Sequence, residues 1–231
     1  MTQDDEKRLV GEAAARHVED GMTLGLGTGS TVAFFAAALG ARIAAGLQVR
    51  AVPTSAQSRA LAETHGIPMT DLETVQELDL AVDGADEVAA DLSMIKGAGS
   101  ALLHEKIVAV ASKRRIYIAD SKKLVRRLGA FPLPVEVCPF GHEGTAGRIA
   151  KSGAEPTLRM SGDAPLRTSD NNLIYDCAYG EIADPAGLER GLGIVPGVME
   201  SGLFIGLVDC LIAVRDGAAV ELLPGDPVWW A

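Results

Sequence analysis

Hydrophobic and polar positions follow one another along the first 120 residues in the rhythm of an α/β sheet. Residues 6–19 carry apolar side chains at helical spacing, and residues 22–26 form a short apolar run typical of a buried strand. The same alternation then repeats. Strands are expected at 49–52, at 80–82, in a run ending near 95 and at 116–119, and helices at 32–45, 55–65 (capped by Thr54 or Ser55) and 100–111. Strands joined by helices in this order predict a parallel sheet.

The pattern changes near Phe131, where FPLPVEVCPF contains three prolines and indicates a domain boundary. A smaller α+β unit is expected after it. Its predicted elements are a helix at 144–151, strands at 157–160 and 173–177, and a helix at 185–192 that proline begins. The apolar runs at 204–214 and 219–222 are predicted strands, and the pattern leaves open which domain they join.

The composition describes a globular protein with an acidic surface. The chain has 231 residues, 48% of them hydrophobic, which is enough to bury a substantial core. Twenty-one Lys and Arg against 31 Asp and Glu give a formal charge of −10. Neither nucleic acid nor an anionic membrane is therefore an expected partner, and an anionic substrate would need a local pocket.

Cysteine usage and hydropathy indicate a cytoplasmic protein. The three cysteines, Cys138, Cys177 and Cys210, show no paired spacing, so we interpret them as buried thiols rather than a disulfide framework or a zinc site. The first ten residues are charged, and no run approaches the roughly 18–20 apolar residues of a membrane helix.

The first segment that could carry chemistry is the glycine-rich turn GLGTGST, residues 25–31. It lies between a predicted strand and a predicted helix, so its amides and the hydroxyls of Thr28, Ser30 and Thr31 could bind a phosphate at the helix N-terminus. It lacks the lysine of a Walker A loop and the third glycine of a dinucleotide fingerprint. A tight turn with a purely structural role is the alternative.

A second segment, LAVDGADEV, places Asp83, Asp86 and Glu87 directly after an apolar strand. Carboxylates in that position lie at the edge of a parallel sheet where ligands bind, and Gly84 permits a close turn. An ordinary solvated turn with an Asp cap explains the pattern equally well. A metal site is not indicated, since no histidine accompanies these acids.

A third segment, MIKGAGSALLHEKIV, combines a lysine, a glycine turn and a helical glutamate. Lys96 ends a strand, while Gly97 and Gly99 allow the backbone to approach a ligand. With a helix starting near Ser100, Glu105 falls in its second turn on or beside the apolar face. A carboxylate there is either paired or functional, because burying it unpaired is costly. The alternative is an ordinary exposed glutamate.

A fourth segment, IADSKKLV, places Lys122 and Lys123 after another strand, where either ammonium could meet a phosphate. The alternative is a solvated helix start. None of the four histidines shows metal-ligand spacing.

Together, GLGTGST, PTSAQS, AVDGADE, MIKGAGSALLHEKI, IADSKK, FPLPVEV and SDNNLIYD resemble the type A ribose-5-phosphate isomerases in order and approximate spacing. The resemblance implies a Rossmann-like large domain, a small ferredoxin-like α+β domain, a homodimer or homotetramer, and no metal or organic cofactor. With that architecture, we predict a catalytic domain of residues 1–131 plus 206–231 and a small domain of residues 132–205.

The resemblance also implies roles for individual residues in interconverting ribose 5-phosphate and ribulose 5-phosphate within the non-oxidative pentose phosphate pathway. It makes Glu105 the general base, with Asp83 and Lys96 as further catalytic residues. The implied substrate-binding residues are Thr28, Gly29, Ser30, Thr31, Asp83, Gly84, Ala85, Asp86, Lys96, Gly97, Ala98, Gly99 and Lys123. The family usually has Asp-x-Ser-Lys where this chain has Asp120-Ser-Lys-Lys, so a gapless comparison favours Lys123 over Lys122 for phosphate.

Two other readings compete with an isomerase. Related sugar-phosphate enzymes, acting on amino-sugar phosphates or lactones, usually employ a catalytic histidine, and no histidine here follows a strand-end motif. A non-catalytic sugar-phosphate sensor is the second. It is disfavoured by the full set of acids and lysine and by the lack of a DNA-binding module.

Overall fold

The structure is a computed structural model that describes residues 1–230, and it divides into two compact units. Unit 1 comprises residues 1–85, 104–124 and 207–230, and unit 2 comprises residues 86–103 and 125–206. This division differs from the predicted boundaries in assigning 86–103, 125–131 and residue 206 to unit 2.

The reason for the difference lies in the contacts of residues 86–103. Two short strands from this segment, β4 (Glu87–Val88) and β5 (Met94–Ile95), form a sheet with β13 (Leu203–Phe204) of the same unit. The buried Glu87 carboxylate accepts hydrogen bonds from the amides of Gly129 and Phe131, at 2.7 and 2.6 Å. Glu87 therefore organises unit 2 from within.

Unit 1 is built on a six-stranded sheet in the order β15-β14-β6-β3-β1-β2, in which every pair is parallel except β14–β15. The predicted parallel α/β sheet is thus confirmed. Its strands are β1 (Thr23–Leu26), β2 (Arg50–Pro53), β3 (Leu78–Gly84), β6 (Ser112–Ala119), β14 (Cys210–Arg215) and β15 (Ala218–Leu222). Its helical segments are α1 (Gln3–Ala15), α2 (Ser30–Ala44), α3 (Ala56–Thr64), α4 (Leu102–Val110) and the 3₁₀ turn η1 (Ser121–Lys123).

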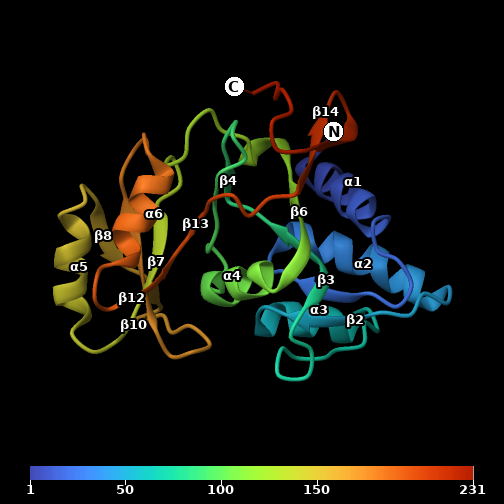
Figure 1. Cartoon of the computed structure of the whole chain (residues 1–231), viewed down its shortest axis with the longest axis horizontal. Coiled ribbons are helices and arrows are strands. Elements are labelled where there is room, and N and C mark those ends of the chain that lie inside the picture. The colour runs from blue at the N-terminus through green and yellow to red at the C-terminus, as the bar shows by residue number, and fades with distance from the viewer. Residues whose placement is uncertain (231) are drawn as a thin grey trace. The chain divides into compact units, whose positions relative to one another are not determined.

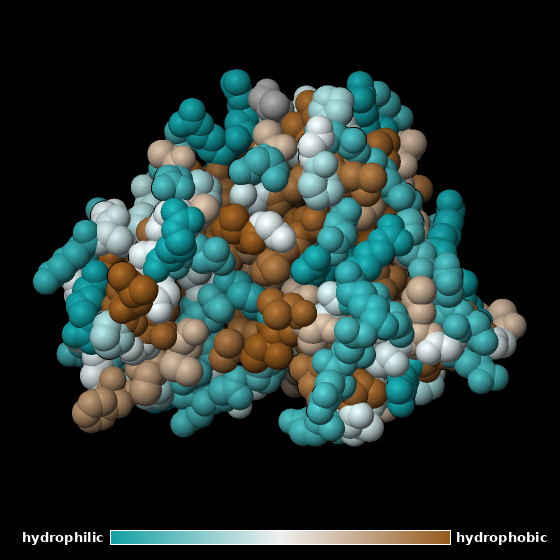
Figure 2. Space-filling model, viewed as in Figure 1, coloured by the Kyte–Doolittle hydropathy of each residue, from teal (hydrophilic) through white to brown (hydrophobic). Residues whose placement is uncertain are grey.

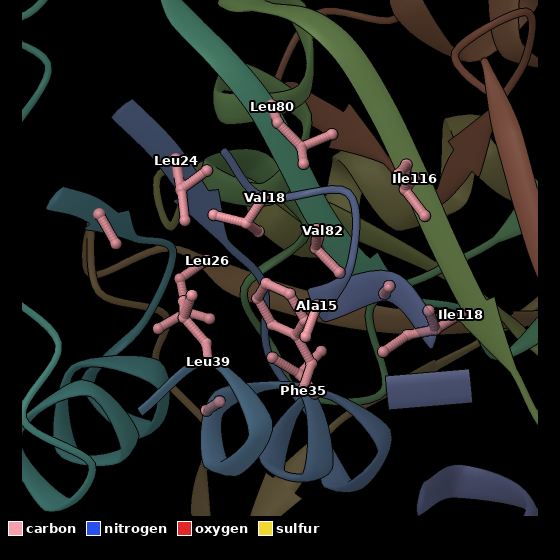
Figure 3. Packing of buried hydrophobic residues seen from close by; sticks show 14 of the residues in the cluster. Ala15, Val18, Leu24, Leu26, Phe35, Leu39, Leu80, Val82, Ile116 and Ile118 are labelled. Atoms are coloured by element: carbon pink, nitrogen blue, oxygen red, sulfur yellow. The ribbon is translucent and has the colours of Figure 1, made fainter. Parts of the chain in front are cut away.

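Helices cover both faces of this sheet (Figure 1). On one face, Phe35 and Leu39 of α2 pack with α1 against Leu26, Val82 and Ile118 of the strands, as Figure 3 shows. On the other face, Val108 of α4 packs in a cluster with Val52, Leu78 and Ala81. Burying these side chains removes apolar area from water, and each large side chain contributes about 1.5–3 kcal/mol to the free energy of folding. The packing holds the parallel strands in place, so that their carboxyl ends lie along one edge of the sheet.

Helix ends follow local chemistry more closely than hydrophobic spacing does. Thr2 caps α1 in a reciprocal capping box with Asp5, so the helix starts earlier than residue 6 and ends at Ala15. Ser55 caps α3, as predicted. The predicted start of α4 near Ser100 was wrong: Ser100 has φ +60°, which no right-handed helix contains, and α4 begins at Leu102.

Unit 2 contains a four-stranded antiparallel sheet in the order β12-β7-β11-β8 with two helices. The elements follow the order βαββαβ of a ferredoxin-like domain, which confirms the predicted small α+β domain. They are β7 (Leu133–Val137), α5 (His142–Ala150), β8 (Glu155–Leu158), β11 (Leu173–Ala178), α6 (Pro185–Gly193) and β12 (Val198–Ser201), with the hairpin β9 (Met160–Ser161) and β10 (Ala164–Pro165) beyond β8.

Two predicted strands are each divided in the structure. The run at 204–214 separates into β13, which belongs to unit 2, and β14, which belongs to unit 1. The run at 157–160 ends β8 at Leu158 and continues as β9, with Arg159 between them.

Surface hydropathy, the burial of the cysteines and helix hydropathy can each be compared with what the sequence predicted. Figure 2 shows hydrophilic side chains on the outer surface of α5, at the left. Cys177 and Cys210 are buried, which raises their pKa values to about 12 and about 11, whereas Cys138 is only partly buried, contrary to the prediction. No helix within residues 1–230 has both the length and the apolar character needed to cross a bilayer.

Candidate active site

The predicted phosphate turn lies at the carboxyl end of β1, where it approaches Asp83 closely. Strand β1 ends at Leu26, and Gly29, with φ +119°, precedes the first residue of α2, Ser30. A Cβ placed on Gly27 would lie 2.0 Å from Asp83 Oδ1. Only glycine therefore fits at position 27 while Asp83 keeps its place.

Asp83 itself is buried and holds this turn. Its Oδ1 accepts hydrogen bonds from the amides of Thr28, at 3.1 Å, and Gly84, at 2.7 Å. Because β1 and β3 are adjacent parallel strands, with Leu26 opposite Val82, the two motifs meet at one sheet edge although they are 55 residues apart. Two amide donors fix the orientation of the carboxylate.

A hydroxyl cluster adjoins the turn. Thr28 Oγ1 lies 2.9 Å from Thr54 Oγ1 and 2.7 Å from Ser55 Oγ, at the junction of β2 and α3. The sequence motif PTSAQS contains both partners, but residue reasoning had given them no role beyond a helix cap. The sequence feature that could have indicated them is their position, because Thr54 and Ser55 follow a strand and precede a helix, as the GLGTGST turn does.

Glu105 lies in the first turn of α4 and is 4% exposed, so the alternative of an ordinary surface glutamate was wrong. A negative side chain in the first turn also interacts favourably with the helix dipole. Glu105 and Asp83 line the same small cavity, together with Gly27, Thr54 and Tyr117. At about 10 Å³, this cavity has room for no more than one water molecule.

The apolar face predicted around Glu105 is only partly correct. Leu102 and Ala109 are buried with it, but Ile107 is 46% exposed and Lys106 is buried. The helix thus carries two buried charged side chains at consecutive positions, and Glu105 is the one that lines the cavity with Asp83.

The lysines of IADSKK lie in η1, after the carboxyl end of β6 and therefore at the same sheet edge as the turn. Lys122 Nζ donates to Gln3 Oε1 at 3.3 Å, and the fully buried Asp120 accepts from the Lys122 amide and from Gln3 Nε2. Lys122 is thus directed to the start of α1.

In unit 2, Asp86 and Lys96 frame the second glycine turn. Asp86 Oδ2 accepts from the Ala98 amide at 2.9 Å. Lys96 is 2% exposed, and its Nζ lies 5.4 Å from the centre of the Phe204 ring, a cation–π distance. The Lys96 amide donates to Gly202 O at 2.8 Å, and a Cβ on Gly202 would come within 2.2 Å of Lys96 O. Sequence reasoning missed both Phe204 and Gly202.

The site residues therefore fall into two sets. Unit 1 brings together Thr28–Thr31, Asp83 and Glu105, with Gly84 and Ala85 following Asp83 and Lys123 at the same sheet edge; unit 2 holds Asp86 and Lys96–Gly99. Two of the histidines make polar contacts away from these residues: His17 with Glu221, and His142 with the Tyr175 hydroxyl. Within residues 1–230, no three His, Cys, Asp or Glu side chains gather as metal ligands.

Comparison with known proteins identifies the family. The family model described as ribose 5-phosphate isomerase A (phosphoriboisomerase A) matches residues 50–217. A protein named ribose-5-phosphate isomerase A from Parvibaculum lavamentivorans is 49% identical over 223 residues, covering 94% of this chain and 96% of the relative. One of the same name from Caulobacter vibrioides is 50% identical over 230 residues, covering 97% and 100%.

Solved structures agree over nearly the whole length. The ribose 5-phosphate isomerase A of Methanocaldococcus jannaschii is 36% identical with a TM-score of 0.91, covering 96% of this chain and all of that one. A D-ribose-5-phosphate isomerase in complex with phospho-erythronic acid is 37% identical with a TM-score of 0.93, again covering 96% and 100%. The chain belongs to the ribose 5-phosphate isomerase A family.

Proposed function

We propose that this chain is an aldose–ketose isomerase that interconverts D-ribose 5-phosphate and D-ribulose 5-phosphate, with Glu105 as the proton carrier. The observation that carries the assignment is that the two buried carboxylates, Glu105 and Asp83, come together at the sheet edge, where they line one small cavity with Gly27 of the GLGTGST turn. Family membership supplies the substrate class.

The chemistry needs one base that serves two carbons. In the aldose-to-ketose direction, Glu105 removes the proton from C2 of the open-chain sugar, leaving an enediolate across C1 and C2. The same carboxyl then returns the proton to C1, while the hydroxyl proton moves from O2 to O1. A single carboxylate located beside both carbons can carry out both transfers. Burial of Glu105 separates it from bulk water, with which the transferred proton would otherwise exchange.

The enediolate oxygen requires positive charge or hydrogen-bond donors that are already in place. We assign this role to the Lys96 ammonium and the amides of residues 97–99, by their match to the family motif. A buried ammonium stabilises a developing oxyanion more strongly than an exposed one, because less water screens it. Lys96, at 2% exposed, meets that condition.

The remaining residues bind the sugar and its phosphate. Asp83, oriented by two amides, is suited to accept a sugar hydroxyl proton and so to assist ring opening. Asp86 is assigned to a second hydroxyl. The amides and hydroxyls of residues 28–31 at the start of the 15-residue helix α2, with Lys123, are suited to the phosphate dianion.

The proposal also covers the oligomeric state of the enzyme, its cofactor requirement and its place in the cell. We expect a homodimer or homotetramer that acts without a cofactor in the cytoplasm, within the pentose phosphate pathway. Light scattering during size-exclusion chromatography measures the assembly directly. A monomer at the concentrations used for assay would contradict that part of the proposal.

The test of the function is a rate measurement on purified protein in excess EDTA, with ribose 5-phosphate as substrate. The wild type should turn over, and Glu105→Gln should lower kcat by about a thousandfold, the range expected for loss of a general base. Glu63→Gln is the matched control, since Glu63 is exposed on α3. Binding of ribose 5-phosphate without turnover by the wild type would instead favour a sensor.

A further inference from the structure

One arginine of unit 2 reaches back to the glycine turn that follows Lys96. Arg159 lies between β8 and β9, and its side chain is only 13% exposed. Its Nη1 donates to Gly97 O at 2.8 Å and to Ser100 Oγ at 3.0 Å, and lies 3.4 Å from Ala98 O. A single guanidinium nitrogen therefore contacts three residues of the turn.

The rest of the same guanidinium is fixed by an aspartate. Arg159 Nε donates to Asp176 Oδ2 at 2.9 Å, and Nη2 donates to Asp176 Oδ1. Asp176 lies in β11, whose Ile174 carbonyl also accepts from the Arg159 amide at 2.8 Å. The bidentate pair sets the plane of the guanidinium, so Nη1 is presented to the turn in one orientation.

The turn needs such support because its backbone is strained. Gly97 has φ +113°, and Ser100 has φ +60°, a left-handed conformation that costs a non-glycine residue energy unless its surroundings enforce it. Arg159 contacts both residues. Residues 97–100 are therefore held in part by a side chain about 60 positions further along the chain.

The contacts also determine which way the amides point. The Gly97–Ala98 peptide is held on both sides, its carbonyl by Arg159 and its N–H by Asp86 Oδ2. In a trans peptide the C=O and N–H point in opposite directions. Since the Ala98 carbonyl also faces Arg159, the Gly99 N–H of that peptide is directed away from the guanidinium.

We propose that Arg159, oriented by Asp176, is a positioning residue for the reaction. It acts through the turn, which it holds so that Lys96 and the Gly99 amide are set for the enediolate oxygen. This inference rests on the proposed function, because it takes residues 96–99 as the substrate loop. A purely structural role would stabilise unit 2 without changing the rate constant of the folded enzyme.

The test compares Arg159→Met, Arg159→Lys and Asp176→Asn by steady-state kinetics and thermal unfolding, with assays well below each Tm. Met retains much of the side-chain length but no donors. We expect Arg159→Met to lower kcat by about 30- to 100-fold, the scale of a loop displaced by about 1 Å, with KM changed less than threefold. Arg159→Lys should restore part of kcat, and Asp176→Asn should lower it by about fivefold, since the guanidinium stays but loses its charged orienting partner.

Arg167→Met is the matched control, because Arg167 is exposed in the same unit and also donates to a carbonyl, Asn171 O at 3.1 Å. Its kcat should equal that of the wild type. Wild-type kcat in both Arg159→Met and Asp176→Asn, with only Tm lowered, would overturn the proposal. If Arg159→Met does not fold, Arg159→Lys and Asp176→Asn decide. Failure of the proposed function is distinguishable, since the wild type itself would then be inactive.

Discussion

An arginine is bound in bidentate fashion by an aspartate in each unit, and the two arginines differ in what their remaining nitrogen contacts. In unit 1, Arg115 of β6 donates from Nε and Nη2 to Asp209, at 2.7 and 2.9 Å. In unit 2, Arg159 uses the same two nitrogens for Asp176 and has its third, Nη1, on the glycine turn. The geometry of the pairs is alike, so the difference lies in what the third nitrogen contacts.

Their places in the sheets explain the difference. Asp209 immediately precedes β14, and Arg115 lies four residues before the carboxyl end of β6, so this pair is roughly 13 Å along the strand from the ligand-binding edge. It joins two strands and reaches no candidate site residue. An Arg–Asp pair is therefore no evidence of function by itself, and the contact with residues 97–100 is what distinguishes Arg159.

Among the additional variants that test this comparison, the largest effect is expected from a substitution that strains the backbone of the turn itself. In Gly97→Ala the new Cβ would lie 2.9 Å from Leu102 Cδ2 and 3.2 Å from Pro134 Cβ, at φ +113°. We expect kcat to fall by about 10- to 100-fold. Combined with Arg159→Met, the loss should be smaller than the product of the two, because both act on one loop.

Gly141→Ala provides the control for this change. Gly141 also has positive φ, +65°, but no atom lies within 4 Å of its Cβ position at the start of α5. It should lose stability by about 1–2 kcal/mol from the left-handed conformation and keep its kcat. If the loss of kcat in the Gly97→Ala, Arg159→Met double variant equals the product of the two single losses, then Arg159 does not act through the turn.

The unit 1 pair should give the opposite result. Arg115→Met removes charge-assisted hydrogen bonds that join β6 and β14, so the free energy of unfolding should fall by about 1–2 kcal/mol while kcat stays unchanged. Urea titration and steady-state kinetics on the same preparation measure both. Arg127→Met is the comparison, because its ion pair with Glu181 is exposed on both sides and contributes little. A fall in kcat for Arg115→Met would contradict the conclusion that only the Arg159–Asp176 pair affects the reaction.

The sequence predicted much of the fold and the local part of the site, because both arise from short-range patterns. Strand and helix periodicity identified the parallel sheet. A strand-end motif made Asp83 a candidate and a helical position made Glu105 one, and the structure brings both to one cavity. Whether these residues act as proposed stays a prediction. Arg159 could not be found in this way, since its contact with Gly97 joins positions 62 residues apart.

The proline-rich segment FPLPVEVCPF, near which we predicted a domain boundary, also forms a buried strand. It contains β7, whose Leu133, Val135 and Val137 are fully buried on alternate positions. Between them, the buried Glu136 accepts from Thr168 Oγ1 at 2.8 Å and Asn172 Nδ2 at 3.0 Å. The SDNN motif thus has a structural use within unit 2 that sequence spacing did not suggest.

A smaller effect is expected from pH. The Arg115 side chain, by its hydrogen bond, lowers the pKa of Asp209 below its usual value of 3.8. A lowered folded-state pKa contributes stability that is present above the unfolded pKa and is lost as pH falls through the folded value. The stability difference between wild type and Arg115→Met should therefore be constant from pH 7 to 5 and shrink below about pH 4. Urea midpoints across that range measure it, and a difference that grows on acidification would contradict the assignment.

The smallest expected change tests whether stability and turnover are separable in unit 2. Gly147 lies in the interior of α5, and its Cβ position is open, with no atom within 4 Å apart from those of its own helix backbone and chain neighbours. Gly147→Ala should raise the free energy of unfolding by up to about 1 kcal/mol, since alanine loses less backbone entropy in a helix. Its kcat should not change. If kcat of this stabilised variant rises or falls, then the rate depends on the general rigidity of unit 2. The Arg159 variants would then have to be compared at equal stability before a change in their kcat is attributed to the turn.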